Sequence, residues 1–255
     1  MALGININIK NIKNIKNLNF IEFIEIADFV FPQTLLDTEF MKEVDDILKK
    51  NSNIKCLEGP IRDIKPEAGD IEIREITKKR FIQLIELASK NNIKYVMFSS
   101  TFDPLVKFDF YTDMWLINNK KFWEEIIKFA EDKKIVCLYC NVWDDTPELL
   151  YELFRHINSE YFRFAMDIGH LNYMSKHTIK YWFEKMEPFL EYICIHDNHG
   201  ERDDHLPLGE GVIDFKKIAK YIKKLNRDID ICIQLFDQSN IQKSIDKWIQ
   251  ISNNV

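Results

Sequence analysis

The chain has 255 residues, of which 46% are hydrophobic and 13% aromatic, which is enough apolar side chain to bury one large core. Charged residues make up 30%, and no long apolar run occurs, so the composition excludes both a membrane-resident chain and a disordered one. The net charge of -6 argues against non-specific nucleic-acid binding, which depends on clustered Lys and Arg.

The cysteines and the amino-terminal segment indicate a cytoplasmic protein. Cys56, Cys137, Cys140, Cys194 and Cys232 are an odd number in a long chain, which does not fit a secreted disulfide scaffold. Lysines at positions 10, 13 and 16 interrupt the stretch in which a signal peptide needs an unbroken apolar segment. We therefore predict a cytoplasmic location.

Short apolar runs rich in β-branched residues recur along the chain, and helical periodicity lies between most of them. The runs predict strands over Leu3–Ile9, Phe20–Ile26, Ile54–Glu58, Ile93–Ser99, Ile135–Cys140, Phe162–Asp167, Tyr192–His196 and Ile229–Leu235. Helices are predicted over Phe40–Lys50, Ile76–Asn91, Phe122–Asp132, Pro147–Ile157, Ile179–Leu190, Phe215–Leu225 and Ile241–Ile251. The first connection, Lys10–Asn19, is short and gives the weakest helical signal.

This alternation predicts parallel strands joined by right-handed crossovers. Eight such units in about 250 residues match a closed (β/α)8 TIM barrel of the α/β class. The alternative is an open doubly wound sheet, but no G-x-G-x-x-G follows the first strand, and Gly209 and Gly211 come late. We predict one barrel domain over residues 1–255, with its functional residues at the carboxyl ends of the strands.

Five of the six histidines lie between the sixth strand and the loop after the seventh. Asp167 and His170 follow the sixth strand and can turn into the barrel mouth, although Asp167 could simply cap a helix. Asp203 and His205 lie in the next loop, which by itself also fits a solvated acidic turn. Because Asp, His and thiolate ligands suit borderline divalent metals, the four residues together favour a metal site.

Two cysteines reach the same edge of the predicted barrel. Cys140 ends the fifth strand, and Cys194 lies on the seventh strand on the same face as His196. Cys137 and Cys140 point to opposite faces of their strand, so their C-x-x-C spacing predicts no zinc knuckle.

Polar residues also occur near the ends of apolar strands, where burial without a partner is costly. They are Glu25, Glu58, Ser99 and Gln234. Glu58, which precedes Gly59-Pro60, is the one of these residues that we most expect at the barrel mouth. The aromatic segment after the fourth strand, TFDPLVKFDFYTDMW, could form an apolar lid, and plain packing or an oligomer contact explains it equally well.

These motifs resemble the xylose isomerase-like barrel superfamily, which holds sugar and sugar-phosphate isomerases and epimerases, inosose dehydratases and the endonuclease IV family. The resemblance spans nearly the whole chain and rests on LGIN, FIEIAD, EGPIRDIKPEAGD, NVWDDTPELL, MDIGHLNY and IHDNHGERDDHLPLGEGVIDF. In the epimerase branch, Glu, Asp, His and Glu on strands five to eight hold a metal, and the two Glu also move the proton. The resemblance places Cys140, Asp167, Cys194 and Gln234 at those positions. An amide does not titrate, so the usual two-carboxylate proton transfer is in doubt.

The endonuclease branch adds histidines on the third and fourth strands, where this chain has Glu58 and Ser99. Its peripheral metal triplet is matched by His170, Asp203 and His205, and this trio could hold one zinc ion. In the sugar-acting relatives, the histidine that corresponds to His170 contacts substrate instead.

The resemblance and the polar rim together predict an enzyme that isomerises, epimerises or dehydrates a small sugar, sugar phosphate or cyclitol. A divalent metal, zinc in preference to manganese, would polarise substrate oxygens, and no nucleotide cofactor is expected. His170 would stabilise an oxyanion, and Glu58 or His196 would act as acid or base. The expected metal ligands are Asp167, His170, Asp203, His205, Cys140 and Cys194. The expected substrate contacts are Arg202, which would steady an anionic group, and Gln234, Ser99 and Glu25.

Two other functions stay open at this point. Loss of both family carboxylates also fits a barrel that binds a ligand without the family's chemistry. An endonuclease IV-like DNA repair enzyme fits less well, because the chain is acidic and most zinc ligands of that branch are missing. We expect no nucleic-acid or membrane partner, and a homodimer or homotetramer is compatible with the resemblance.

Overall fold

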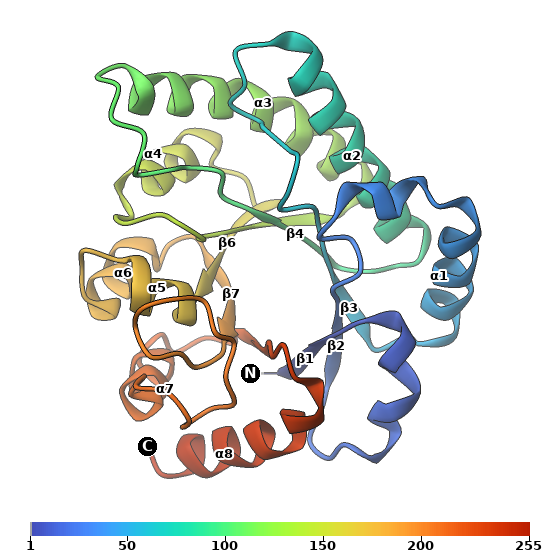
Figure 1. Ribbon diagram of the computed structural model, residues 1–255, viewed down its shortest axis with the longest axis vertical. Helices are drawn as coiled ribbons and strands as arrows, with labels where there is room; N and C mark the ends of the chain where they lie inside the picture. Colours follow the sequence, from blue (N-terminus) through green and yellow to red (C-terminus); the bar gives the residue numbers. More distant parts are fainter. Residues whose placement is uncertain (1) are drawn as a thin grey trace.

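The computed structural model describes residues 2–255, apart from the side chains at positions 14, 16 and 17. Its parallel strands close into one barrel in chain order, from β1 to β8 (Figure 1). Gly4 of β1 lies opposite Phe23 of β2 on one side and opposite Cys232 of β8 on the other, which closes the ring. The predicted TIM barrel is confirmed, and it takes up the described chain as a single domain. Residue 1 of the predicted domain lies outside the described residues.

The strands follow the predicted order, with differences at their ends. They are β1 Leu3–Ile7, β2 Phe23–Ile26, β3 Ile54–Glu58, β4 Tyr95–Ser99, β5 Val136–Cys140, β6 Phe162–Asp167, β7 Leu190–Ile195 and β8 Asp230–Ile233. The prediction that β2 begins at Phe20 is wrong, because Phe20 is exposed and has a left-handed φ of 66°. Ile9, predicted to end β1, instead begins a 3-10 helix.

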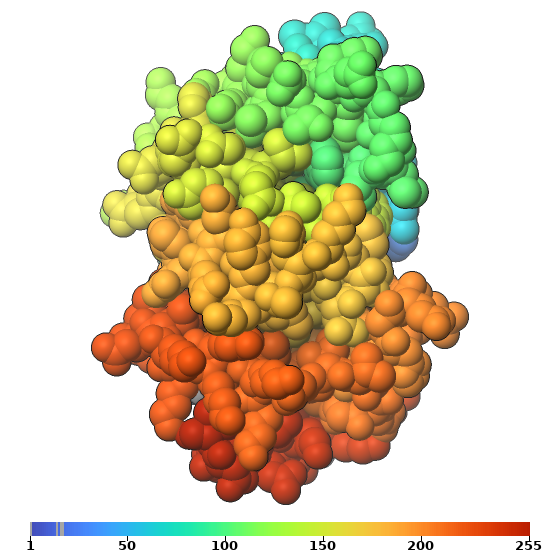
Figure 2. Space-filling view, turned by 90° about the vertical axis from the view of Figure 1, so that its left-hand side faces the viewer, coloured from blue at the N-terminus to red at the C-terminus, as the bar shows by residue number. Residues whose placement is uncertain are grey.

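Helices surround the strands on all sides (Figure 1). The α-helices are α1 Thr38–Lys50, α2 Ile71–Lys90, α3 Tyr111–Lys133, α4 Glu148–Ile157, α5 Ile168–Met174, α6 Ile179–Met186, α7 Phe215–Lys224 and α8 Ile241–Asn253, and the 3-10 helices are η1 Ile9–Asn17, η2 Pro32–Leu36 and η3 Gln238–Asn240. The first crossover is therefore the 3-10 helix η1. The short helix α5 is missing from the prediction, and α3 starts well before Phe122. On the outside of the molecule, consecutive segments of the chain lie next to one another, from green through gold to red (Figure 2).

The apolar faces of the helices pack against the outside of the barrel. In α2, Phe81, Leu84 and Ile85 lie on one face and are fully buried. The Phe81 ring stacks on Phe98 of β4, with 3.9 Å between ring centroids, and such a pair stabilises the fold by about 0.5–1.5 kcal/mol beyond its burial. Asp70 caps this helix by accepting the Glu72 N–H at 2.8 Å. The sequence therefore forms this helix through its apolar face and its cap together.

A second, smaller core fills the inside of the barrel. Period-two alternation turns every other strand residue inward. This core contains Phe23, Cys56, Tyr95, Met97, Leu138, Cys140, Ala165, Tyr192, Cys194 and Cys232. Cys137 packs in the outer core instead, so the prediction that it and Cys140 face opposite sides is confirmed. The inner core closes the barrel below its carboxyl-terminal end and forms the base of the site described next.

The aromatic segment after β4 does not form a lid. Tyr111 and Trp115 lie in α3, where Trp115 is fully buried and both rings pack on Phe102. Leu105 and Phe108 are exposed, and neither is among the described residues that line the cavity at the barrel mouth. Packing therefore explains the buried half of the segment. In residues 2–255, none of the helices combines the length and apolar character that crossing a bilayer requires.

Candidate functional site

A cavity of about 510 Å³ lies at the carboxyl-terminal mouth of the barrel, where catalytic residues of this fold collect. Five residues predicted from the sequence line it: Glu58, His170, Asp203, His205 and Gln234. Aromatic and polar walls complete it, and they include Asn6, Phe31, Arg62, Trp143, Tyr173 and Phe236. The site residues therefore come from the ends of β1, β3, β6 and β8 and from the loop after β7.

Asp167 connects the end of β6 to α5. Its Oδ1 accepts the His170 backbone N–H at 2.8 Å, so it caps α5. The same Oδ1 lies 3.0 Å from Nε2 of His196. The first turn of α5 carries His170 to the cavity wall, so the hydrogen bond that caps α5 also positions a residue of the site. The prediction that Asp167 caps a helix is confirmed, and its use as a metal ligand stays a prediction.

His170, Asp203 and His205 converge on one point of the cavity wall. Nε2 of His170 lies 3.4 Å from Oδ2 of Asp203, and Nε2 of His205 lies 3.2 Å from its Oδ1. Nδ1 of His170 contacts the Asn141 carbonyl at 2.8 Å, and Nδ1 of His205 contacts the Gln234 carbonyl at 3.0 Å. Each ring is therefore oriented through Nδ1, which leaves Nε2 free for a ligand.

The loop that carries Asp203 and His205 is held by Asp197. The Asp197 side chain accepts backbone N–H groups of Gly209 at 2.9 Å and Ile213 at 3.1 Å. The Asp197 backbone also forms an antiparallel bridge with Leu206. His205 itself adopts a left-handed φ of 46°, which is uncommon for a residue other than glycine and marks a constrained position.

Opposing charges set the protonation states in this cluster. Burial lowers the pKa of His170, but Asp167 and Asp203 outweigh it and raise the pKa to about 10. Burial also opposes ionisation of Asp167, yet His170 and His196 lower its pKa to about 2. His170 holds the pKa of Asp203 well below its usual range despite burial. The cluster thus contains the carboxylates of Asp167 and Asp203 around a strongly basic imidazole, and of the two only Asp203 lines the cavity.

His196 lies behind this trio and does not line the cavity. It is fully buried, and its ring stacks on His205 with 3.7 Å between centroids and 3° between planes. Its Nδ1 is buried and has no hydrogen-bond partner among the described residues. Burial lowers the pKa of His196, so it stays neutral. His196 therefore supports Asp167 and His205, and its Nε2 also lies 3.7 Å from Oδ1 of Asp203. Its role as an acid or base stays a prediction.

Gly169 gives His196 the room that it needs. A β-carbon at Gly169 would lie 2.0 Å from Cε1 of His196. We expect Gly169→Ala to lower the free energy of unfolding by about 1–3 kcal/mol, the usual cost of overpacking. Urea denaturation measures this change. Gly69→Ala is the control, since its β-carbon would meet nothing within 4 Å, and equal stability of the two variants would contradict this packing.

A second cluster lies inside the barrel, below the trio. It consists of Cys140, Asp167 and Cys194, which are all buried. Each residue offers one atom that could bind a metal, and these three atoms lie within 4.8 Å of one another. Burial raises the pKa of the Cys194 thiol well above its usual value. None of the three is among the described residues that line the mouth cavity. The predicted metal ligands therefore fall into two sets, of which only the trio faces the cavity.

Glu58 and Glu25 share the amide of Asn6 at the opposite wall. Nδ2 of Asn6 donates to Glu25 Oε1 at 2.7 Å and to Glu58 Oε2 at 2.8 Å. Glu25 also accepts hydrogen bonds from Gln234 Nε2 at 2.6 Å and the Tyr192 hydroxyl at 2.9 Å. Burial and the nearby Glu25 raise the pKa of Glu58 to about 8. Glu58 is thus the carboxyl group at the cavity with the properties of an acid or base.

Three predicted substrate contacts lie elsewhere. Glu25 is fully buried beneath the cavity with its oxygens already engaged. Ser99 is buried at the end of β4, outside the described lining of the cavity. Arg202 is exposed and pairs with Asp204 at 2.5 Å, also outside that lining. Their places could not be predicted from the sequence, because the end of a strand does not determine how deep a side chain lies, and a loop arginine has no periodicity to orient it.

Two functional asparagines were missed. Asn6 is a polar residue at the end of an apolar strand, so the criterion that selected Glu58 could have found it. Asn141 follows Cys140, and its amide pairs with the Asp167 backbone at 2.9 and 3.1 Å. Nothing in the local sequence separates Asn141 from an ordinary loop residue.

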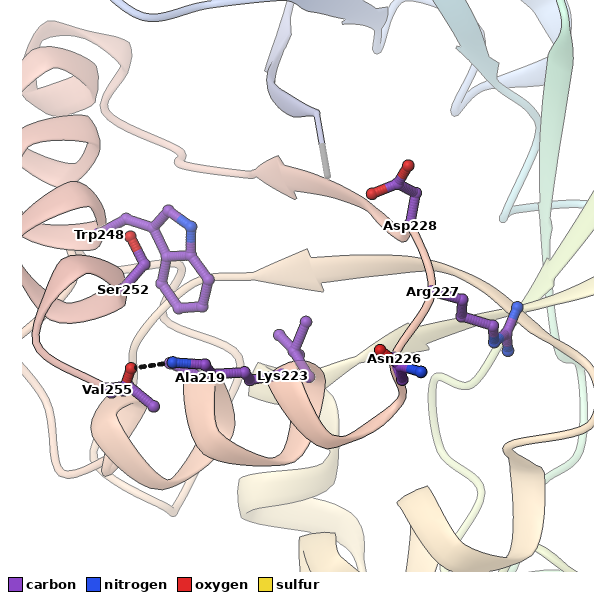
Figure 3. Close-up of a pocket in the computed structure, with 9 residues that line it drawn as sticks. Ala219, Lys223, Asn226, Arg227, Asp228, Trp248, Ser252 and Val255 are labelled. Atoms are coloured by element: carbon purple, nitrogen blue, oxygen red, sulfur yellow. Dashed lines mark hydrogen bonds between the residues drawn. The ribbon is translucent and has the colours of Figure 1, made fainter.

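Another cavity, of about 500 Å³, lies between α7 and α8 at the amino end of β8 (Figure 3). Lys223 Nζ donates to the Val255 carbonyl oxygen at 2.5 Å. Arg227 donates to the carbonyl of Glu187 at 2.8 Å. The positively charged side chains of this cavity, Lys223 and Arg227, are thus hydrogen-bonded to backbone oxygens, and no His or Cys belongs to the described lining. The amino-terminal end of such barrels serves stability, so we place the functional site at the mouth.

A family model described as Xylose isomerase-like TIM barrel matches residues 12–251, and the chain therefore belongs to this family. The uncharacterized protein MJ1311 of Methanocaldococcus jannaschii is 26% identical over 207 residues, which cover 76% of this chain and 70% of that protein. The predicted family is confirmed.

Solved structures show the same fold along the whole chain. A D-tagatose 3-epimerase-like protein has a TM-score of 0.84 and 24% identity, and the match covers 100% of this chain and 99% of that one. The D-psicose 3-epimerase of Clostridium cellulolyticum H10, solved with D-tagatose, has a TM-score of 0.78 and 14% identity, with 100% and 99% covered. The IOLI protein with a bound zinc atom has a TM-score of 0.76 and 17% identity, with 100% and 96% covered.

Proposed function

We propose that the protein is an isomerase that moves a proton next to the carbonyl of a small sugar, sugar phosphate or cyclitol. One observation carries this proposal: Glu58 and the trio of His170, Asp203 and His205 line the same mouth cavity. Sugar epimerases among the proteins of the same fold support the substrate class.

The trio has the properties of a zinc site. Nε2 of His170 lies 3.4 Å from Oδ2 of Asp203, and Nε2 of His205 lies 3.2 Å from its Oδ1. One ligand atom of each residue lies within 4.8 Å of those of the other two, which is close enough for a shared ion. Oδ1 of Asp203 is buried and accepts no hydrogen bond from the described residues. His170, Asp203 and His205 would therefore hold the ion through Nε2, a carboxylate oxygen and Nε2, after His170 loses its proton.

Zinc at this position supplies a Lewis acid that polarises the substrate carbonyl and a neighbouring hydroxyl. Glu58 would take the proton from the hydroxyl-bearing carbon beside that carbonyl and deliver it to the former carbonyl carbon, while the hydroxyl proton passes to the former carbonyl oxygen. Asn6 fixes Oε2 of Glu58 at 2.8 Å, and His196 positions the trio through its stack on His205. Trp143, Tyr173 and Phe236 border the cavity and exclude water.

A single free carboxyl group favours isomerisation over epimerisation. Inversion at carbon needs proton-transfer groups on both faces, whereas a 1,2-proton shift removes and returns the proton on one face. Among the described lining residues, Glu58 and Asp203 carry carboxyl groups, and Asp203 belongs to the trio. The positions that resemble the two family glutamates hold Cys140 and Gln234. Gln234 donates its amide to Glu25 and cannot take up a proton.

The test is solvent exchange. Zinc-loaded protein is incubated in D2O with a panel of aldoses, ketoses, their phosphates and inososes, the keto forms of inositols, and proton NMR follows exchange and product. We expect one substrate to incorporate deuterium at a single carbon with conversion between aldose and ketose. Exchange with inversion at the same carbon would indicate an epimerase, and no exchange with any compound would leave a ligand-binding barrel and overturn the proposal.

A further inference from the structure

The mouth cavity continues into a second cavity of about 510 Å³. The two share three lining residues: Asn8, Phe236 and Gln238. The second cavity lies between η1 and η3, beside the start of α8, and its remaining wall includes Lys10, Asn11, Leu18 and Ser239. Sites for drug-sized ligands measure about 300–1,000 Å³, so each cavity alone reaches that range. The pair offers more room than one hexose needs.

Phe236 stands at the junction of the two cavities. Its ring is 69% exposed, although large aromatic side chains usually avoid water. The ring also stacks on His205, with 4.2 Å between centroids and 21° between planes. An exposed aromatic side chain that borders both spaces offers a platform for the apolar face of a sugar ring. It also joins the second cavity directly to the trio.

The walls of the second cavity fit a neutral, hydroxylated ligand. The side-chain amides of Asn8, Asn11 and Gln238 line it. Nδ2 of Asn11 donates to Oε1 of Gln238 at 2.5 Å, so Oδ1 of Asn11 and Nε2 of Gln238 are the atoms of this pair that can accept from and donate to a ligand. The charged groups on its wall are Lys10 and Asp237, whose formal charges sum to zero. Apolar side chains such as Ile15 and Leu18 complete it. A hexose ring has this combination of hydroxyl groups and apolar C–H faces, whereas a phosphate would leave Asp237 opposed to a like charge.

We propose that the second cavity binds a second sugar ring, so that the substrate is a disaccharide whose reacting ring occupies the mouth cavity. This inference rests on the proposed isomerase function. The reacting ring lies against Glu58 and the trio, and the glycosidic bond crosses the gap beside Phe236. The second ring contributes binding energy without touching the reacting atoms, which enzymes use to hold the reacting ring in position.

The test compares parent sugars with their glycosides by titration calorimetry on the zinc-loaded protein. The probes are D-fructose with maltulose and isomaltulose, and D-glucose with maltose and isomaltose. We expect at least one disaccharide to bind at least tenfold more tightly than its parent. Ser239→Trp, which fills the second cavity only, should abolish this gain and leave the parent sugar unaffected, while Ser239→Ala should keep the gain.

The outcomes separate the two proposals. If a parent sugar binds and no disaccharide binds more tightly, the second subsite is wrong and the isomerase proposal stands. A gain that survives Ser239→Trp, or an equal loss for parent and disaccharide, also overturns the subsite. If none of the parent sugars or disaccharides binds, and no compound of the D2O panel exchanges a proton for deuterium, the sugar isomerase proposal fails, and this inference fails with it.

Discussion

Asp203→Asn is expected to reduce zinc affinity more than a hundredfold. Asp203 lies between His170 and His205, with Oδ2 at 3.4 Å from Nε2 of His170 and Oδ1 at 3.2 Å from Nε2 of His205. Oδ1 is buried and accepts no hydrogen bond from the described part of the chain. An asparagine keeps the shape but removes the charge that holds the ion. Loss of an outer-sphere partner typically costs roughly 10–100-fold in metal affinity, and loss of a ligand exceeds that. Competition with a chelating dye measures the zinc affinity.

The control for this change is Asp204→Asn. Asp204 is the neighbouring residue and pairs with Arg202 at 2.5 Å, outside the described lining of the cavity. We expect its zinc affinity to match the unmodified protein. Cobalt spectra distinguish the two clusters, because thiolate ligands add a charge-transfer band in the near ultraviolet. Such a band, lost in Cys140→Ser, would move the metal to the inner cluster of Cys140, Asp167 and Cys194 and contradict the assignment to the trio.

Glu58→Gln is expected to lower kcat by roughly 10²–10⁴-fold, the usual contribution of a general acid or base. Glutamine can still accept the hydrogen bond from Asn6, so the shape of the wall is kept. Burial and Glu25, with Asp167, raise the pKa of Glu58 to about 8, and Asn6 and His170 act in the opposite direction. Because the base must be ionised, kcat/KM should rise with pH through about 8 and then level off.

The remaining activity of Glu58→Gln should lack this rise with pH. Glu201→Gln serves as the matched control, since Glu201 is an exposed residue of the loop after β7. Its rate and pH profile should equal those of the unmodified protein. A full rate in Glu58→Gln would remove Glu58 from the proton transfer. An unchanged pH profile with a lower rate would make it a structural residue of the wall.

Much of the site followed from strand ends alone. Asp167 and Glu58 lie at the carboxyl ends of β6 and β3 as predicted, because parallel strands bring these ends to one edge. His170 follows from Asp167, since the cap of α5 fixes its place. The place of Arg202 outside the described lining of the cavity could not be predicted, because its loop is held by Asp197 through contacts that have no sequence period.

The five cysteines separate what the local sequence pattern predicts from what only the tertiary structure determines. The sequence by itself determined the barrel, the order of its strands and the opposite faces of Cys137 and Cys140, because hydrophobic periodicity depends only on neighbours along the chain. Only the tertiary structure decided that Cys140 and Cys194 lie beneath the cavity while His170, Asp203 and His205 open into it. Depth along the barrel axis depends on the stagger of strands and on how the loop after β7 folds back, which are contacts between residues far apart in the chain.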